Sequence, residues 1–141
     1  MTPLTHWPHE ARRNLVGVFT DIDDTLTTDG AITPDALQAL ADLKAAGLLV
    51  IPITGRPIGW CEPFMAQGPG AAWPVDAMVA ENGAVAFVRG PAPQQPLSKL
   101  YQQDAATRSA NQARMRAIAA QVAAEVPGVE LSRDSAGRET D

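Results

Sequence analysis

The amino-acid sequence predicts an α/β fold, because two apolar segments of strand length lie on either side of one amphipathic helix. The first segment, residues 15–20, is apolar almost throughout rather than alternating, as expected for a strand covered on both faces. The second, residues 48–53, has the same character and follows within about forty residues. A strand, a helix and a strand at this spacing form a βαβ unit with parallel strands and a right-handed crossover.

The helix between these strands is predicted at residues 34–46 from the signals at its two ends. Thr33 is a typical N-cap, Pro34 suits the first helical position, and Gly47 suits the residue that follows a helix. The apolar residues in between recur on one helical face, which is expected to pack on the sheet: Ala36, Leu37, Leu40 and Leu43.

Three further elements are predicted before residue 89. A short helix is expected at residues 58–67 and a third strand at residues 77–81. Asn82-Gly83 is a strong hairpin signal, so residues 84–88 are expected to return as an antiparallel strand.

The remaining sequence differs in character. Residues 89–103 are rich in proline and glutamine, which predicts a loop or a domain boundary. Apolar residues at helical spacing predict a helix at residues 104–126, ended by Pro127-Gly128. Residues 129–131 are a candidate start of another strand.

Composition and charge restrict the partners and the location. With 45% hydrophobic residues, the 141-residue chain can bury one core. A formal net charge of −5 without a long basic run gives no electrostatic basis for binding nucleic acid or an anionic membrane surface. The sequence lacks a signal-peptide pattern and any apolar stretch near the roughly 18 residues of a membrane span. Its single cysteine, Cys61, cannot form an intrachain disulfide. We therefore expect a cytoplasmic protein.

The first predicted strand ends in an acidic run. Asp21 and Asp23 can face one crevice there, since residues two apart in a strand point to the same side, and ligands of open α/β sheets bind beyond strand carboxyl ends. One carboxylate can attack phosphorus while the other transfers protons, and both can bind Mg2+ through oxygen. The alternative is an acidic turn or a calcium loop. A helix-loop-helix calcium site would need glycine where Leu26 stands.

The segment Asp21-Ile22-Asp23-Asp24-Thr25-Leu26-Thr27 resembles the first motif of the haloacid dehalogenase superfamily, which includes aspartate-nucleophile phosphatases and phosphomutases. The resemblance implies that Asp21 is the nucleophile, Asp23 the general acid and base, and Thr25 a phosphate-binding residue. It also implies a partial Rossmann-like parallel sheet core. A magnesium ion would be held by the Asp21 carboxylate and the Asp23 backbone carbonyl.

The segment Ile53-Thr54-Gly55-Arg56, at the end of the second predicted strand, resembles the second motif of the same superfamily. The resemblance implies that Thr54, with Gly55, binds the transferring phosphoryl group. Taken alone, Thr54 would more often be a helix cap or a turn residue. Arg56 and Asn82 are candidate substrate contacts. The alternatives are a solvated or ion-paired arginine and a hairpin turn without a further role.

The spacing of the motifs indicates the type of cap domain. The 28 residues between Thr25 and Thr54 are nearly all used by the βαβ unit, so no large cap fits there. The similar members of the superfamily insert an α/β cap after the third strand. We therefore expect an N-terminal arm, the N-terminal half of the core and the beginning of an α/β cap at residues 1–13, 14–88 and 89–141. Candidate polar cap residues, unless this region is a solvated tail, are Arg133, Asp134, Arg138 and Glu139.

Two parts of the superfamily pattern have no match in the sequence. A third-motif lysine is not found, because Lys44 lies on the crossover helix and Lys99 in the proline-rich region, and no acidic pair closes a later apolar strand. Because the unmatched parts are contiguous, we expect a chain truncated at its C-terminus. Such a chain would leave a sheet edge and apolar helix faces uncovered.

The sequence favours a Mg2+-dependent phosphatase that acts on a small phosphorylated metabolite, a sugar or polyol phosphate, through an aspartyl phosphate. A phosphomutase of the same superfamily is the first alternative. A non-catalytic domain is the second, either receiver-like or a phosphate-binding remnant. A receiver, however, would carry its phospho-acceptor aspartate where Glu81-Asn82-Gly83 stands. The sequence leaves the oligomeric state open.

Overall fold

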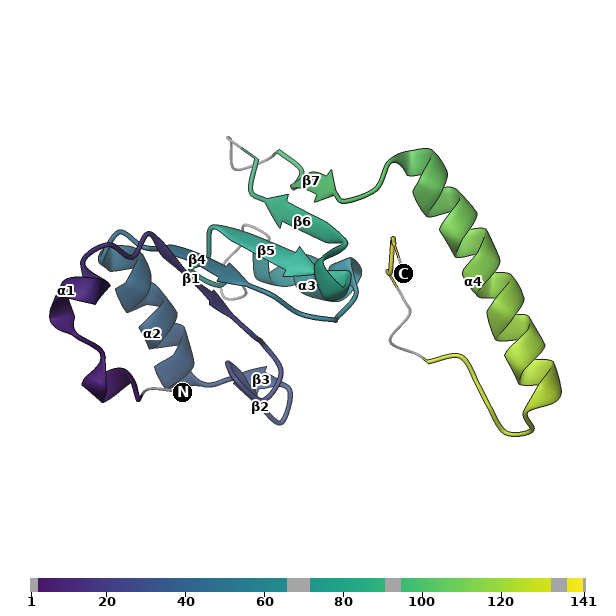
Figure 1. The fold of residues 1–141 in the computed structure, drawn as a ribbon, viewed down its shortest axis with the longest axis horizontal. Coiled ribbons are helices and arrows are strands. Elements are labelled where there is room, and N and C mark those ends of the chain that lie inside the picture. The colour runs from purple at the N-terminus through teal and green to yellow at the C-terminus, as the bar shows by residue number, and fades with distance from the viewer. Residues whose placement is uncertain (1–2, 66–71, 91–94, 133–136, 141) are drawn as a thin grey trace.

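The computed structural model describes residues 3–65, 72–90, 95–132 and 137–140 (Figure 1). Short helical turns lead into a region of strands and helices, and one long helix follows. The elements are η1 (Leu4–His6), α1 (His9–Arg12), β1 (Gly17–Thr20), β2 (Thr27–Thr28), β3 (Ala31–Ile32), α2 (Pro34–Ala45), β4 (Leu49–Pro52), α3 (Ile58–Met65), β5 (Ala77–Ala80), η2 (Glu81–Gly83), β6 (Val85–Val88), β7 (Ser98–Tyr101) and α4 (Ala105–Glu125).

The strands of the core follow the spatial order β1, β4, β5, β6, β7. β1 and β4 are parallel, with Thr20 opposite Pro52 at their carboxyl ends. A parallel bridge between Ile53 and Val79 joins β4 to β5, and β5, β6 and β7 are antiparallel neighbours. The α/β class and the predicted βαβ unit are therefore confirmed.

The local signals around α2 and the β5–β6 hairpin are also confirmed. The Thr33 hydroxyl accepts a hydrogen bond from the Ala36 backbone N–H at 3.4 Å, and Pro34 is the first helical residue. Gly47 follows the helix with φ of +81°, a conformation that glycine adopts without steric cost. Asn82 and Gly83 lie in the turn that joins β5 to β6.

The hydrophobic core is centred where α3 packs on β5. Ile58, Cys61 and Met65 of α3 are fully buried, together with Met78 of β5 and Phe87 of β6. Cys61 is thus a buried residue of this cluster. Burying such side chains is worth about 1.5–3 kcal/mol each, so this cluster stabilises the packing of α3 on the sheet.

A polar contact fixes α2 against the sheet beside this core. The Asp76 carboxylate pairs with the Lys44 ammonium of α2 and accepts a hydrogen bond from the Val50 backbone N–H at 2.8 Å. Burial raises the pKa of Asp76, but the hydrogen bonds from Lys44 and Val50 outweigh it, so the pKa lies below its usual range. The ionised carboxylate therefore stabilises the folded chain.

Two sequence predictions about the C-terminal third are wrong. Residues 89–103 are not a loop throughout, because residues Ser98–Tyr101 form β7 and pair with β6. This strand has only four residues and follows a proline cluster, so its own pattern is too short to identify it. Residues 129–131 do not form a strand. They lie exposed, and none of the strands in the described ranges pairs with them. Residues 66–67, the predicted end of the helix at 58–67, lie outside the described residues.

Much apolar surface remains uncovered, as expected from the sequence. The accessible surface is 9534 Å2, against about 7,000 Å2 for a compact chain of this mass. Val16, just before β1, is 79% exposed, and Phe19, within β1, is 68% exposed. The long helix α4 has no buried residue. In Figure 1, α4 stands apart from the sheet. α4 is also too polar for a membrane span, and no other helix within the described ranges is long and apolar enough to cross one.

The exposed edge of the sheet predicts self-association. Among the described residues, β1 pairs only with β4, which leaves apolar side chains and backbone groups at its outer edge. We expect the chain to form larger species as its concentration rises. Phe19→Lys should raise the monomer fraction, because a charged side chain disfavours edge pairing.

Sedimentation velocity over a range of concentrations measures this effect. Gln38→Lys, on the exposed side of α2, adds the same charge away from β1 and should leave the association unchanged. A wild-type chain that stays monomeric throughout would contradict the prediction.

The Asp76 contact predicts a pH-dependent stability. Because the folded-state pKa is depressed, the carboxyl stabilises the fold above its unfolded pKa, and this contribution is lost as pH falls through the folded value. Asp76→Asn should lower the free energy of unfolding at pH 7 by on the order of 1 kcal/mol. Urea unfolding should show that the difference from wild type shrinks as the pH falls below the ordinary pKa of an aspartate. A difference independent of pH would argue against this role.

Candidate functional site

The loop after β1 is held by one backbone carbonyl. Ile22 is fully buried, and its carbonyl oxygen accepts hydrogen bonds from the backbone N–H groups of Thr25 (3.3 Å), Leu26 (2.9 Å) and Thr27 (3.1 Å). The Thr27 hydroxyl donates to the same oxygen at 3.1 Å. The apolar residue between the aspartates thus anchors the loop, and Asp21 and Asp23 lie on its outer side.

The loop after β4 begins with a buried threonine. Thr54 is 4% exposed, and its backbone N–H donates to the Val79 carbonyl at 2.9 Å. Its hydroxyl accepts a hydrogen bond from the Arg56 backbone N–H at 3.1 Å. A hydroxyl that accepts one hydrogen bond can still donate its own proton, so Thr54 is suited to binding an anion.

The turn after β5 meets this second loop. The Glu81 backbone N–H donates to the Arg56 carbonyl at 3.0 Å, and that of Asn82 to the Thr54 carbonyl at 3.3 Å. A side chain at Gly55 would place its Cβ 2.8 Å from the Asn82 Oδ1 atom, so the two loops are in close contact. Glu81 and Asn82 both have positive φ, at +52° and +56°, an uncommon conformation for residues other than glycine.

An ion pair joins the first two loops. The Arg56 guanidinium donates to the Asp23 carboxylate through Nη2 (2.9 Å to Oδ1) and Nε (3.1 Å to Oδ2). The forked geometry matches the planar carboxylate, which makes this a directional contact. The guanidinium also lies over the ring of Trp60, 5.1 Å from its centroid, which fixes the plane of the arginine. Trp60 therefore orients Arg56 in addition to packing against its neighbours.

The structure brings most of the predicted site residues together. Thr54, Gly55, Arg56 and Asn82 contact one another across the loops after β4 and β5, and Asp23 joins them through Arg56. Asp21 directly follows the end of β1 and is exposed. Thr25 is likewise exposed on the outer side of the first loop. The predicted polar residues Arg133 and Asp134 lie outside the described ranges.

The described loops offer some, but not all, of the oxygen ligands that a Mg2+ ion requires. Asp21 and Asp23 offer carboxylate and backbone carbonyl oxygens of the kind Mg2+ prefers. Within the described ranges, however, no group of three histidine, cysteine, aspartate or glutamate residues could hold a metal ion. The Asp23 carboxylate is engaged by Arg56, so the fitting ligands are the Asp21 carboxylate and the Asp23 carbonyl.

Both lysines of the chain take part in ion pairs away from these loops. Lys44 pairs with Asp76, and Lys99 lies 2.8 Å from Glu62 and 2.6 Å from Glu139. Burial lowers the pKa of Lys99, but its hydrogen bonds to the two carboxylates outweigh this and raise the pKa above its usual range. Lys99 is therefore a charged structural residue.

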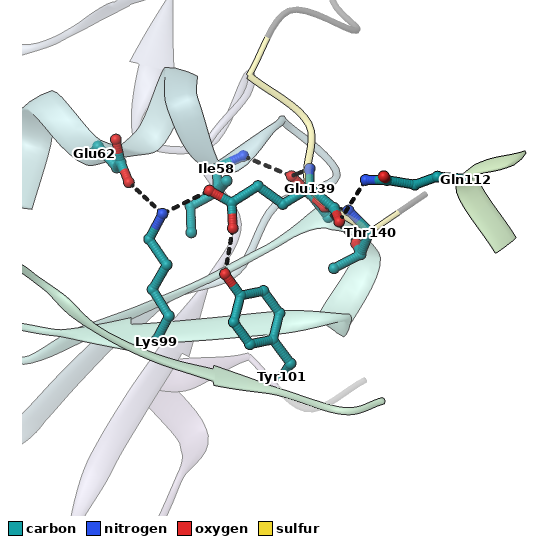
Figure 2. A network of polar contacts seen from close by, with 8 residues as sticks. Ile58, Glu62, Lys99, Tyr101, Gln112, Glu139 and Thr140 are labelled. Carbon is teal, nitrogen blue, oxygen red and sulfur yellow. Dashed lines mark hydrogen bonds and ion pairs between the residues drawn. The ribbon is translucent and has the colours of Figure 1, made fainter. Parts of the chain in front are cut away.

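Sequence reasoning missed the contacts of Glu81. Its side chain is 1% exposed, and its carboxylate accepts hydrogen bonds from the backbone N–H groups of Ile58 (3.0 Å), Glu139 (2.8 Å) and Thr140 (2.7 Å), and from the Thr140 hydroxyl. Figure 2 shows these groups converging from α3 and from the C-terminal segment. These contacts connect the end of β5 to α3 and to the C-terminal segment. The only sequence signal is a charged residue at the end of an apolar strand.

A comparison with protein families identifies the family of the chain. Residues 18–120 match the family model described as haloacid dehalogenase-like hydrolase. The match spans well over half of the chain, so the chain belongs to that family. The comparison with curated proteins gave no match.

Several solved structures are similar to the chain. One of them is that of BT1666 from Bacteroides thetaiotaomicron, described in a study of phosphatases of the haloalkanoate (HAD) enzyme superfamily. The sequence identity is 18% and the TM-score 0.49, and the similarity covers 89% of this chain and 52% of that chain. The chain therefore spans about half the length of this solved relative.

The ion pair between Arg56 and Asp23 predicts a measurable coupling between the two loops. In a double-mutant cycle with Arg56→Gln and Asp23→Asn, we expect a coupling free energy of about 0.5–1 kcal/mol, because the contact is forked but partly exposed. Urea unfolding of the four variants gives this value. The matched cycle with Asp24→Asn, which removes the next carboxylate along the loop, should give a smaller coupling. Equal couplings in the two cycles would show that the contact does not form.

Proposed function

We propose that the protein is a Mg2+-dependent phosphatase that hydrolyses a small sugar or polyol phosphate through an aspartyl phosphate. The observation that carries this proposal is the contact of Arg56 with Asp23, which joins the loop after β1 to the loop after β4. It supports a common site for Asp21 and Asp23 on one side and Thr54 and Gly55 on the other. Membership of the haloacid dehalogenase-like hydrolase family supports the same chemistry.

In the proposed reaction, a carboxylate oxygen of Asp21 forms a bond to phosphorus while the ester P–O bond breaks. Asp23 donates a proton to the leaving oxygen. Water then attacks the phosphorus of the aspartyl phosphate, and Asp23 accepts the proton of that water. Inorganic phosphate leaves and the Asp21 carboxylate is restored. Thr54 and the Gly55 backbone hold the phosphoryl oxygens, with Thr25 as a further phosphate-binding residue of the first loop.

Arg56 has to change partners during this cycle. Its guanidinium donates two hydrogen bonds to the carboxylate that transfers protons. The arriving phosphoryl group offers the guanidinium another anionic partner, which releases Asp23 for the leaving oxygen. Asn82 is the proposed substrate contact from the third loop. A magnesium ion, held by the Asp21 carboxylate and the Asp23 carbonyl, would neutralise charge on the phosphoryl oxygens.

The proposal extends to domains and location. Residues 14–88 would form the N-terminal half of the catalytic core, after an arm at residues 1–13, and residues 89–141 part of a cap that limits access of water. The substrate would be a small phosphorylated metabolite of the cytoplasm, and the charge of −5 disfavours nucleic acid and membrane partners.

A non-catalytic role is the second candidate. It is favoured by one observation: the described residues hold no third acidic ligand beside Asp21 and Asp23. A protein that binds Mg2+ and phosphate without turnover would fit that ligand set. A phosphomutase would share the Asp21 chemistry but return the phosphoryl group to a sugar hydroxyl.

The test is release of inorganic phosphate from a panel of sugar and polyol phosphates, with and without Mg2+. Asp21→Asn should reduce release by at least about a thousandfold, because the nucleophile is lost. Asp24→Asn, which removes a neighbouring carboxylate, is the matched control and should retain most of the activity.

The outcomes separate the candidates. Release that needs both Mg2+ and Asp21 establishes the phosphatase. An isomerised sugar phosphate without free phosphate would identify the mutase. A folded chain that binds Mg2+ and phosphate but turns over none of the panel would sink the catalytic proposal.

A further inference from the structure

The C-terminal segment, residues 137–140, is fastened to the core on both sides of Arg138. After Arg138, the backbone N–H groups of Glu139 and Thr140 donate to the buried carboxylate of Glu81. Before it, Gly137 packs on Gly59 in the first turn of α3, and the Gly59 backbone N–H donates to the Gly137 carbonyl at 3.3 Å. The backbone at Arg138 is therefore fixed from two directions.

The side chain of Glu139 adds a second set of contacts to this segment. Its carboxylate accepts hydrogen bonds from Lys99 and from the Tyr101 hydroxyl of β7, as Figure 2 shows. The Gln112 side chain of α4 donates to the Glu139 carbonyl at 2.8 Å. Burial raises the pKa of Glu139, but the hydrogen bonds from Lys99 and Tyr101 outweigh it and lower the pKa, which favours the ionised form.

Arg138 itself reaches the proposed phosphate-binding loop. Its Nη2 atom donates to the Gly55 carbonyl at 3.2 Å, although the two residues are 83 positions apart in the sequence. Gly55 lies between Thr54, the proposed phosphoryl ligand, and the Asn82 amide. A guanidinium is thus placed beside the proposed substrate site by a segment whose other residues are all held in place.

Arg138 also lines a hollow of about 1080 Å3 between α4 and residues 129–132. Among the described residues that line this hollow, the ionisable ones are Arg116, Arg138 and Glu130, and Asn82 and Gln112 add amide donors. Two guanidinium groups against one carboxylate favour an anionic ligand, in contrast to the acidic loop after β1. A guanidinium binds carboxylate and phosphate through paired, planar hydrogen bonds.

We propose that Arg138 is a specificity residue that binds a second acidic group of the substrate, on the part that remains after phosphate is removed. The preferred substrates are then phosphate monoesters that also carry a carboxylate or a second phosphate. The transferring phosphoryl group belongs to Asp21 and Thr54, and Arg138 approaches from the side of Asn82 and the hollow. This inference rests on the proposed function, whose site it extends.

The test compares two pairs of ligands that differ at one position. 6-Phosphogluconate carries a carboxylate where sorbitol 6-phosphate has a hydroxymethyl group, and glucose 1,6-bisphosphate carries a phosphate where glucose 6-phosphate has a hydroxyl. Calorimetric binding is measured to the full chain in an Asp21→Asn background with Mg2+, where no ester is hydrolysed. We expect the diacidic member of at least one pair to bind about tenfold or more tightly, as for a charged hydrogen-bonded contact. The pair that shows the preference identifies the acidic group.

Arg138→Gln should abolish this preference while leaving the affinity for the neutral member unchanged, and Arg138→Lys should restore part of it. Arg114→Gln removes the same charge from the exposed surface of α4, outside the hollow, and should keep the preference. A merely structural role for Arg138 would change the affinity for both members of a pair alike.

Two results would overturn the inference. The first is equal binding of the two members of each pair, or no measurable binding of any of the four ligands. The second is tighter binding of the diacidic ligand that persists in the Arg138→Gln variant. Turnover by the wild-type chain is measured separately. If the diacidic ligand binds more tightly but the wild-type chain hydrolyses no ester, this inference stands and the phosphatase is rejected. If the wild-type chain hydrolyses esters but binds both members of each pair equally, the phosphatase stands and this inference is rejected.

Discussion

The buried carboxylate of Glu81 is the contact on which the arrangement of the molecule depends. Burying a charge is costly unless hydrogen bonds replace its hydration, and four donors meet this carboxylate. Three of them come from Glu139 and Thr140, and one from the start of α3 at Ile58. The same residue, through its backbone, joins the turn after β5 to Arg56. One residue therefore contacts both the loop after β4, through its backbone, and the segment that carries Arg138, through its side chain.

The parts of the fold that the sequence predicts are those with local causes. Thr33, Pro34 and Gly47 define the ends of α2 through contacts within the helix itself, and Asn82-Gly83 defines the hairpin. β7 escaped prediction because its four residues become a strand only by pairing with β6, so its signal lies in another segment. Residues 129–131 have strand-like composition but pair with no strand in the part of the chain that the structure describes, which is why composition alone misleads there.

The residues of the candidate site likewise fall into two groups: those that a local sequence motif predicts and those that only the folded chain brings together. The two motifs around Asp21 and Thr54 can be found in the sequence because each occupies consecutive positions at a strand end. The contacts of Arg56 with Asp23 and of Arg138 with Gly55 span 33 and 83 residues, and only the folded chain brings them together. Glu81 is the extreme case. Its partners lie 23, 58 and 59 residues away, so no local pattern marks it as a structural centre.

The contact between Gly59 and Gly137 limits how this family of sequences can vary. A Cβ atom at either position would lie 2.9–3.0 Å from the Cα atom of the other, and Gly137 in addition has φ of +81°. The residues at these two positions therefore cannot be substituted independently of each other. A homologue with a larger residue at one of them cannot keep the C-terminal segment on α3 in this way, and the arginine that follows Gly137 would lose this support.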